Sequence, residues 1–411
     1  MSNSKKLLKG VKVIELANFI AAPACGRFLA DAGAEVIKIE TPAGDPLRYT
    51  APTEGRPLSQ EVNTTFDLEN SNKKCIVLNL RSDNGRKIFF EMLKDAAILL
   101  TNWRPEALKR AGFDYETLKK DHPALVYAMI AGYGEKGPDA NLPGFDFTAF
   151  FARGGILGTL YEKGTSPMNP IPGLGDHQSG LFLAAGTVAA LYKAKMTGEG
   201  EKVTVGLFQS AIYTIGIMLQ AAQYPDYGTP YPMNARTYPN PLIAAHRTSD
   251  DYFVQICMPP YDPCYDKFMT CIGREDLVGD ERYNTMKNLG DKGYEVYDII
   301  AAEMVKKSKD EWNEIFRAND IPFAVAQRWE DLLEDEQAWA NDYLHEMHYP
   351  NGDKKALVRL PYTYEEMGLP EYNQSSQLGG DTKIVLESMG YSEAEIEKLA
   401  ADKDILLGKQ N

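Results

Sequence analysis

The sequence predicts an α/β protein whose larger part is a doubly wound, mostly parallel sheet. Short apolar runs alternate with helical stretches from residue 11 to residue 130, which is the pattern of successive βαβ units. The chain has 411 residues, which predicts two or three domains rather than one. Apolar residues make up 44% and charged residues 25%, the balance of a globular protein with a sizeable core.

The first βαβ unit is the clearest element. Residues 11–16 and 35–40 are expected strands, and Pro23 suits the first turn of a helix between them that runs to Ala32, with Gly33 closing it. The pattern then repeats, with expected strands at 75–80, 97–101 and 124–130 and expected helices at 85–94 and 105–111. These strands should lie in one parallel sheet.

The second half of the chain is expected to complete this domain and to begin another. Between Gly173 and Lys195 the chain is expected to turn sharply and then enter a long apolar helix, which is followed by a strand at 202–206. Residues 221–245 are rich in Pro, Tyr and Asn without periodicity, which indicates a linker. A second unit opens with a strand at 251–256, and further helices are expected at 262–273, 294–318, 331–340 and 392–399.

Charge and cysteine usage exclude several classes of partner. The net charge is −14, and no run of Lys and Arg forms a basic patch, so nucleic acid is not an expected partner. No segment reads as a secretion signal or a membrane span, so no membrane association is expected. Five sparse cysteines in a long chain indicate free thiols, hence a cytoplasmic protein without a metal site.

Three common catalytic signatures are missing or incomplete. Gly132-Tyr-Gly134-Glu-Lys-Gly137 satisfies G-x-G-x-x-G, but the prolines that follow prevent the helix that a dinucleotide site requires. The sequence contains no P-loop and no G-x-S-x-G elbow. A nicotinamide dehydrogenase, phosphoryl transfer and serine hydrolysis are therefore disfavoured.

Asp176 is the most interesting candidate for chemistry. It follows two glycines at 173 and 175 and precedes an apolar helix, so it occupies an expected N-cap position. Most such aspartates only cap their helix. The alternative is functional, because a helix N-terminus keeps a carboxylate ionised and small neighbours leave room for a substrate. His177 beside it is a further candidate, as a general base.

Several segments in the same order resemble the class III CoA-transferases, the formyl-CoA and carnitine CoA-transferase group. They are residues 10–16, 22–23, 34–40, 72–74, 101–103, 132–138 and 175–176. The resemblance implies that Asp176 is a covalent nucleophile. It also implies CoA thioesters as substrates, with no permanently bound cofactor. It implies a Rossmann-like large domain over 1–220 completed by 330–411, a linker at 221–245, a small α+β domain at 246–329 and an interlocked homodimer.

The resemblance also carries over a set of CoA contacts. These are Ile20, Ala21, Leu78, Asn79, Leu80, Arg81, Asn102, Trp103, Arg104 and Arg110. The family often has arginine where this chain has Thr41, and Arg48 is expected to compensate for it. The family's glycine-rich loop, which closes over the site, corresponds here to residues 257–261, of which Met258, Pro259, Pro260 and Tyr261 are expected at the substrate.

The position of Phe145 separates the transferase from its rival within the family. The 2-methylacyl-CoA racemase carries histidine before an aspartate there, whereas this chain reads Gly144-Phe145-Asp146 and phenylalanine cannot accept a proton. Phe145 and Asp146 are expected at the substrate, and Phe147 and Phe151 are further candidates for an aromatic pocket.

Within the family, residues 43–50, 144–151 and 335–341 resemble the enoyl-CoA:(R)-2-hydroxy acid transferases of amino-acid-fermenting anaerobes. The resemblance implies CoA transfer from an enoyl-CoA such as cinnamoyl-CoA to an (R)-2-hydroxy acid such as phenyllactate. It also implies a 2-hydroxyacyl-CoA dehydratase as a partner enzyme. The alternatives are 2-hydroxyisocaproate as the acceptor, a racemase, and a CoA-binding protein without activity.

Overall fold

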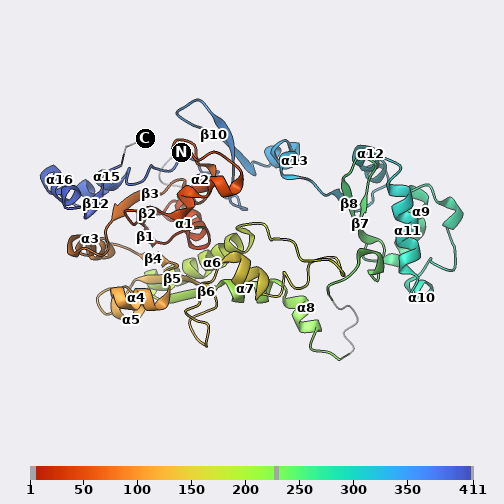
Figure 1. Ribbon diagram of the computed structural model, residues 1–411, viewed down its shortest axis with the longest axis horizontal. Helices are drawn as coiled ribbons and strands as arrows, with labels where there is room; N and C mark the ends of the chain where they lie inside the picture. Colours follow the sequence, from red (N-terminus) through yellow and green to blue (C-terminus); the bar gives the residue numbers. More distant parts are fainter. Residues whose placement is uncertain (1–5, 226–230, 409–411) are drawn as a thin grey trace. The chain divides into compact units, whose positions relative to one another are not determined.

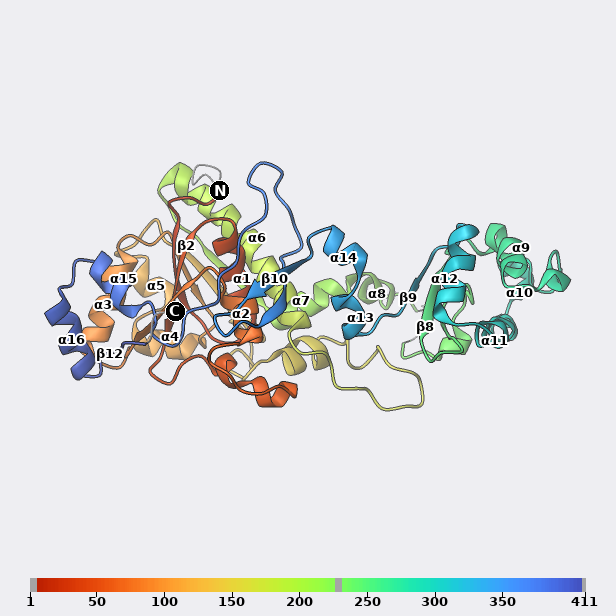
Figure 2. The same ribbon diagram turned by 90° about the horizontal axis from the view of Figure 1, so that it is seen from above.

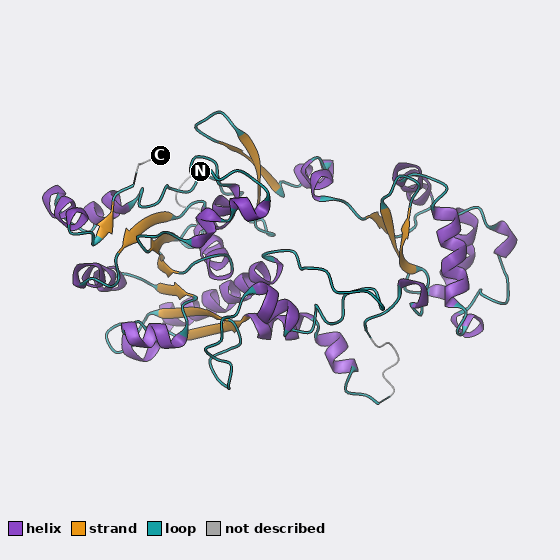
Figure 3. Ribbon diagram, in the orientation of Figure 1, coloured by secondary structure: helices purple, strands orange, loops and turns teal. Residues whose placement is uncertain are grey.

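The computed structural model describes residues 6–225 and 231–408, and the chain divides into two compact units. Unit 1 comprises Met1–Leu157, Asn169–Ala221 and Gln337–Asn411, and unit 2 comprises Gly158–Met168 and Ala222–Glu336. The described residues of the expected 221–245 linker therefore fall in unit 2 from Ala222 onward. Figure 3 shows the strands and helices of both units.

A seven-stranded sheet forms the centre of unit 1, in the order β12-β3-β2-β1-β4-β5-β6 (Figure 1). Six strands are parallel, and only β12 runs antiparallel to its neighbour β3. The strands are apolar because both faces of the sheet are covered. Their bounds are β1 (Lys12–Leu16), β2 (Glu35–Glu40), β3 (Lys74–Leu78), β4 (Ile98–Thr101), β5 (Val126–Ala131), β6 (Lys202–Gly206) and β12 (Ile405–Leu406).

Helices cover both faces of this sheet, as Figures 1 and 2 show. On one face α1 (Ala21–Asp31) and α6 (Leu174–Thr197) pack together over Val13, Leu100 and Ala128. The other face buries Ile14, Leu99 and Met129 against α3 (Asp83–Leu93), α4 (Pro105–Ala111), α5 (Tyr115–Leu118), α15 (Thr382–Ser388) and α16 (Glu393–Ala401). The doubly wound prediction is confirmed.

The remaining elements of unit 1 lie at the edges of this core. They include a two-stranded antiparallel hairpin and three helices that the sequence analysis did not predict. Their bounds are β10 (Leu344–His348), β11 (Lys354–Val358), α2 (Thr64–Asn70), α7 (Leu207–Thr214) and α8 (Gly216–Ala221).

Unit 2 has its own sheet and its own core. Its three antiparallel strands are β7 (Ile243–Arg247), β8 (Phe253–Cys257) and β9 (Phe323–Val325). The core contains stacked Trp312 and Phe316. The helices of unit 2 and of its boundary with unit 1 along the chain are α9 (Tyr261–Cys271), α10 (Met286–Leu289), α11 (Gly293–Met304), α12 (Lys309–Ala318), α13 (Trp329–Leu333) and α14 (Glu336–Ala340). The helix expected at 294–318 is two helices, α11 and α12, and the helix expected at 331–340 is also two, α13 and α14.

The strand order creates a switch point between β1 and β4. The chain leaves β1 toward β2 and β3 on one side, and it continues from β4 toward β5 and β6 on the other. Ligands of open α/β sheets bind at the carboxyl ends of the strands at such a point. There Asn18 and Asn102 hydrogen-bond to each other, through the Asn18 N–H (3.1 Å) and the Asn102 side-chain amide (2.7 Å).

Two sequence-level exclusions can be compared with the fold. The segment Gly132 to Gly137 forms bends rather than the start of a helix, as the prolines that follow it predict. Among the described residues, no helix combines the length and the apolar character needed to cross a bilayer.

Candidate active site

A cleft of about 510 Å³ opens at the switch point of unit 1. Asp176 lines it together with Asn18, Asn102 and residues that follow β5. Because six parallel strands direct their carboxyl ends to one edge, residues distant in sequence meet here. The lining consists of Asn18, Phe19, Ala21, Asn102, Trp103, Arg104, Pro105, Ala107, Arg110, Met129, Ile130, Ala131, Gly132, Ala140, Leu142, Pro143, Gly144, Phe145, Asp176 and Leu207.

Asp176 lies in the first turn of α6 and is not its N-cap, so that part of the prediction is wrong. The helix begins at Leu174, and its N-cap is Gly173 in the left-handed conformation (φ 84°). The Asp176 side chain is partly exposed, and within the described chain it accepts no hydrogen bond from the helix. Its carboxylate is therefore free to react with a group in the cleft.

The two glycines before Asp176 are both required by this geometry. Gly173 occupies a left-handed backbone region that favours glycine. At Gly175 an added Cβ would collide with the Phe150 ring and with Asp146 Oδ1. The turn that presents Asp176 therefore depends on close packing as well as on backbone freedom.

Asp146 holds this turn from another element, the π-helix η4 (Asp146–Ala152). Its Oδ2 accepts a hydrogen bond from the Gly173 N–H (2.8 Å), and its Oδ1 accepts one from the Gly175 N–H (3.1 Å). Asp146 is buried and does not line the cleft. Both of its oxygens are engaged with the helix N-terminus, and the expectation that Asp146 contacts substrate stays a prediction.

His177 points to Glu69 of α2. His177 Nε2 lies 2.7 Å from Glu69 Oε1, and Glu69 is buried. Burial by itself lowers the pKa of His177, but the hydrogen bond and charge of Glu69 outweigh it and the pKa is raised. His177 Nε2 is thus engaged with Glu69, and when protonated His177 favours the ionised carboxylate of Asp176 next to it.

The nucleophile candidate has an altered acidity. Burial, and then the nearby charge of Asp146, raise the pKa of Asp176 to about 7. Burial also raises the pKa of Asp146 to about 6, although the two backbone N–H groups oppose this. A cleft carboxyl group that interacts with a second, buried carboxyl group is typical of a functional site. An ionised Asp176 is accordingly more basic, and more nucleophilic, than an ordinary aspartate.

Cations and an indole form another part of the same cleft. Arg104 and Arg110 are exposed there, beside Trp103 and Asn102, and neither arginine forms an ion pair within the described residues. Unpaired guanidinium groups suit phosphate, which they bind through two parallel hydrogen bonds. The structure thus brings five of the residues expected to bind CoA to Asp176: Ala21, Asn102, Trp103, Arg104 and Arg110.

The other expected CoA contacts lie elsewhere. Leu78 is fully buried in the core, Leu80 packs against it, and Asn79 donates its N–H to the Asp404 carbonyl of the C-terminal segment (2.7 Å). Arg81 is exposed beyond the end of β3, two strands from the switch point. Ile20 is the N-cap of α1 and packs beside Leu47 and Phe66 rather than lining the cleft.

Arg48 does not compensate for Thr41, so this expectation is wrong. Its guanidinium is buried and grips Glu40 with two hydrogen bonds, from Nε (2.8 Å) and Nη2 (2.7 Å). It also lies 3.7 Å over the Phe66 ring. A side chain held in this way has no free face for a nucleotide.

The four expected loop residues belong to unit 2. Met258 and Tyr261 are buried in the unit 2 core, and Tyr261 begins α9 with its hydroxyl donating to the Tyr283 carbonyl (2.8 Å). Pro259 and Pro260 are exposed between them. The segment has anchored ends and two prolines, unlike a glycine-rich loop.

Among the aromatic candidates, only Phe145 lines the cleft. Phe151 packs in the core between sheet and helices, so its expected role in a pocket is wrong. Phe147 is 40% exposed and lies outside the cleft. Sequence reasoning missed Asn18 and Phe19, whose only signal was their position directly after the first strand.

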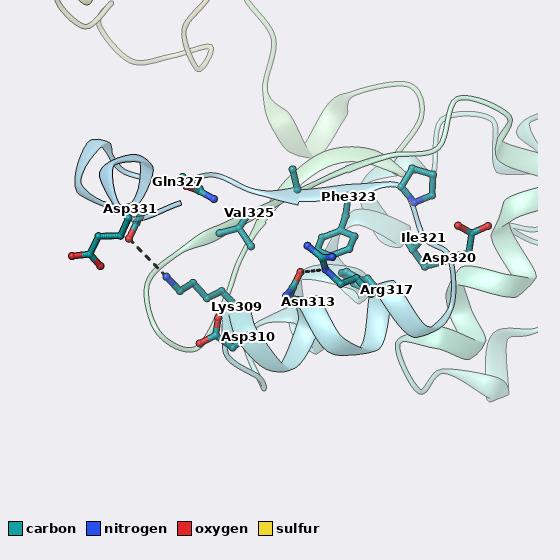
Figure 4. A pocket seen from close by; sticks show the side chains of 14 residues that line it. Lys309, Asp310, Asn313, Arg317, Asp320, Ile321, Phe323, Val325, Gln327 and Asp331 are labelled. Atoms are coloured by element: carbon teal, nitrogen blue, oxygen red, sulfur yellow. Dashed lines mark hydrogen bonds and ion pairs between the residues drawn. The ribbon is translucent and has the colours of Figure 1, made fainter. Parts of the chain in front are cut away.

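Unit 2 carries a groove of its own, of about 810 Å³, between α12 and β9 (Figure 4). Lys309 points toward Asp331 (4.0 Å), and Arg317 donates to Asn313 (2.9 Å). Its cations are thus engaged with neighbouring side chains. The unit 1 cleft instead combines a free carboxylate with two unpaired arginines, so it is the candidate active site.

Two of the cysteines are poorly suited to act as nucleophiles. Cys25 and Cys75 are buried, and burial raises the pKa of each thiol to about 12. In the described part of the chain, no three His, Cys, Asp or Glu side chains gather as a metal site would require.

Comparison with known proteins gives a consistent result. The chain matches the model of CoA-transferase family III over residues 8–382. It is 67% identical over 411 residues to the cinnamoyl-CoA:phenyllactate CoA-transferase of Clostridium sporogenes, covering 100% of both chains. It is 43% identical over 397 residues to the (R)-2-hydroxy-4-methylpentanoate CoA-transferase of Clostridioides difficile, covering 97% of this chain and 99% of that one.

Solved structures of the same family have a similar fold. A CAIB/BAIF family protein from Brucella suis matches with a TM-score of 0.80 at 25% identity, over 93% of this chain and 99% of that one. The resemblance inferred from the sequence is confirmed over nearly the whole chain. The chain belongs to CoA-transferase family III.

Proposed function

We propose that this chain moves CoA from an enoyl-CoA of the cinnamoyl-CoA type to an (R)-2-hydroxy acid such as phenyllactate, with the Asp176 carboxylate as nucleophile. One observation carries the proposal: the carboxylate of Asp176, which accepts no hydrogen bond among the residues that the structure describes, lines the cleft that also contains Arg104 and Arg110. The 67% identity to a relative that acts on cinnamoyl-CoA and phenyllactate supports the substrate class.

The chemistry of Asp176 begins with attack on a thioester. A carboxylate oxygen attacks the thioester carbonyl of the donor, the carbon–sulfur bond breaks, and a mixed anhydride and CoA thiolate form. The thiolate then attacks the Asp176 carbonyl carbon, which releases the donor acid and leaves an aspartyl-CoA thioester.

The acceptor reverses these steps. Its carboxylate attacks the aspartyl-CoA thioester and forms a second mixed anhydride with release of the thiolate. Attack of the thiolate on the acceptor carbonyl gives the new acyl-CoA and regenerates the Asp176 carboxylate. Each step converts a thioester into an anhydride or an anhydride into a thioester, so the acyl group stays activated throughout. The reaction therefore needs neither ATP nor a metal.

Residues around Asp176 are suited to this cycle. Arg104 and Arg110 would bind the phosphates of CoA, and Asn102, Trp103 and Ala21 would contact its nucleotide portion. Ala21 lies at the start of α1, directly after the first strand, where α/β folds bind diphosphates. Asn79, Leu80, Arg81 and Ile20 are further contacts implied by the family, for parts of CoA beyond this cleft, whereas the implied contact at Leu78 would need its buried side chain to become accessible.

The surface of unit 1 supports a homodimer. Helix α6 is apolar around its circumference, and such helices are normally buried. Large apolar side chains are nevertheless strongly exposed on α6, α7 and α8, namely Tyr192, Met196, Tyr213 and Ile217. A second copy of the chain, interlocked with the first as in the family, would cover them.

The product places the enzyme in a reaction sequence. An (R)-2-hydroxyacyl-CoA is activated for loss of water, and its dehydration returns an enoyl-CoA that can donate CoA again. We therefore propose a 2-hydroxyacyl-CoA dehydratase as the partner enzyme, in the cytoplasm of an amino-acid-fermenting cell.

A CoA-exchange assay tests the function. Purified protein is incubated with cinnamoyl-CoA and one of phenyllactate, indolelactate, 4-hydroxyphenyllactate or 2-hydroxyisocaproate, and the new thioester is quantified. We expect transfer to phenyllactate, and a loss on the order of a thousandfold or more in Asp176→Ala. Transfer at an undiminished rate in this variant would refute the mechanism, and no transfer by the native chain would indicate a binding protein.

A further inference from the structure

Phe19 and Phe145 form an edge-to-face aromatic pair in the cleft of Asp176. Their ring centroids are 5.9 Å apart and their planes meet at 87°. Both residues line the cleft, and Phe145 is 54% exposed. Exposed apolar surface inside a cleft is characteristic of a ligand contact. The pair therefore presents aromatic surface to whatever the cleft binds.

The backbone of Phe19 is held in an unusual conformation. Its φ is 61°, a left-handed value that is uncommon for a bulky side chain. Asp45 Oδ1 accepts a hydrogen bond from the Phe19 N–H (3.0 Å). Lys38 in turn bonds Asp45 Oδ2 (2.8 Å) and the Ala17 carbonyl (2.8 Å), and both charged residues are fully buried. Backbone strain kept by its surroundings in this way points to a functional constraint.

The residue that follows each of the two phenylalanines packs against the turn that presents the nucleophile. Asp146, directly after Phe145, holds the N–H groups of Gly173 and Gly175. Ile20, directly after Phe19, has its side chain beside Gly173, where it would lie 3.5 Å from an added Cβ. Phe19, Phe145 and the reacting carboxylate line the same cleft, where the acyl part of a bound thioester has to lie.

We propose that the Phe19–Phe145 pair contacts the acyl group of the substrate and selects aryl over branched-alkyl acyl groups. This inference rests on the CoA transfer proposed above. A phenyl ring packs edge-to-face or offset against aromatic neighbours, whereas a branched alkyl group gains only burial of its surface. Asp45 is a positioning residue, because it fixes the backbone of Phe19 and with it the angle between the two rings.

A competition assay measures this selection directly. Equal concentrations of phenyllactate and 2-hydroxyisocaproate compete for CoA from one cinnamoyl-CoA pool, and the ratio of the two products gives the ratio of kcat/KM. That ratio is independent of the fraction of folded enzyme and of contacts with the CoA arm. We expect Phe145→Leu and Phe19→Leu each to lower the aryl preference about 3- to 10-fold.

Control variants separate selection from a structural role. Phe147→Leu, in the same segment but outside the cleft, should leave the ratio unchanged, and Phe19→Tyr should preserve it by retaining the ring. An unchanged ratio in Phe145→Leu would overturn the proposal even if the rate fell, because the ring would then contact the CoA arm. Since Phe145 is largely exposed, its replacement should not prevent folding. Failure of the native chain to transfer CoA to either acid would refute the proposed function instead.

Discussion

Replacing Asp146 with asparagine should shift the pH dependence of CoA transfer. In the native chain burial and the Asp146 charge together raise the pKa of Asp176 from 3.8 to about 7. Burial is the larger cause, so Asp146 accounts for less than half of this rise of roughly three pH units. We expect Asp146→Asn to lower the pKa of Asp176 by about one pH unit, equivalent to about 1.4 kcal/mol.

The sign of the effect follows from the reacting form of Asp176. Only the ionised carboxylate attacks a thioester, so kcat/KM falls as the pH drops through the pKa of Asp176. At pH 6 the native enzyme should retain about one-tenth of its plateau value and the variant about one-half, from the ionised fractions at a pKa of about 7 and about 6. Because Asp146 titrates nearby, the native acid limb should also be broader than that of a single group.

The assay is kcat/KM for phenyllactate between pH 5 and pH 9 at constant ionic strength. Asp114→Asn is the matched control, because Asp114 also accepts a helix N–H, from Thr117 (3.2 Å), but at the exposed start of α5. Its acid limb should coincide with that of the native enzyme. An unmoved limb in Asp146→Asn would refute the view that Asp146 sets the acidity of the nucleophile.

Three further predictions concern stability, CoA affinity and packing. Asp176→Asn should raise the free energy of unfolding at pH 8 by about 1 to 3 kcal/mol, a range that allows for solvent screening of the carboxylate. The reason is that the pKa of Asp176 is raised in the folded state, so its ionisation destabilises the fold above pH 7. Urea denaturation should show this gain, and it should shrink as the pH falls from 7 toward 3.8 and vanish below about pH 3, where the carboxyl is protonated in both states. Arg104→Ala and Arg110→Ala should each raise the KM for every acyl-CoA about 10-fold or more in steady-state kinetics, and the KM should depend less on salt concentration. A KM equal to that of the native enzyme would show that the arginine does not bind phosphate. Gly175→Ala should abolish transfer, since its Cβ collides with Phe150, and a fully active variant would contradict the packing described for this turn.

The sheet could be predicted from the sequence because its signals are local. Runs of five or six residues rich in Val, Ile and Leu, each starting within two residues of a glycine, gave β1, β2 and β6 at or within one residue of their observed bounds. Helix α2 was missed because its seven residues, capped by Asn63, are too short for a periodic pattern.

The site was predictable in part. Asp176 and the arginines of the cleft came from the family resemblance, while the start of α6 was placed late because Gly173-Leu174-Gly175 looks like a turn. That turn is helical because Asp146, 27 and 29 residues upstream, accepts its N–H groups, a tertiary contact without a local signal. The burial of Arg48 against Glu40 and the strained Phe19 are likewise set by packing, which the sequence pattern does not encode.

Trapping the covalent intermediate tests the central claim most directly. The native enzyme is mixed with cinnamoyl-CoA without an acceptor, treated with hydroxylamine, digested, and examined by peptide mass spectrometry. We predict a hydroxamate on Asp176 alone, dependent on the donor thioester and lacking in Asp176→Asn. Modification of another side chain, or turnover with Asp176 never modified, would contradict a mechanism that passes through an Asp176 anhydride and thioester.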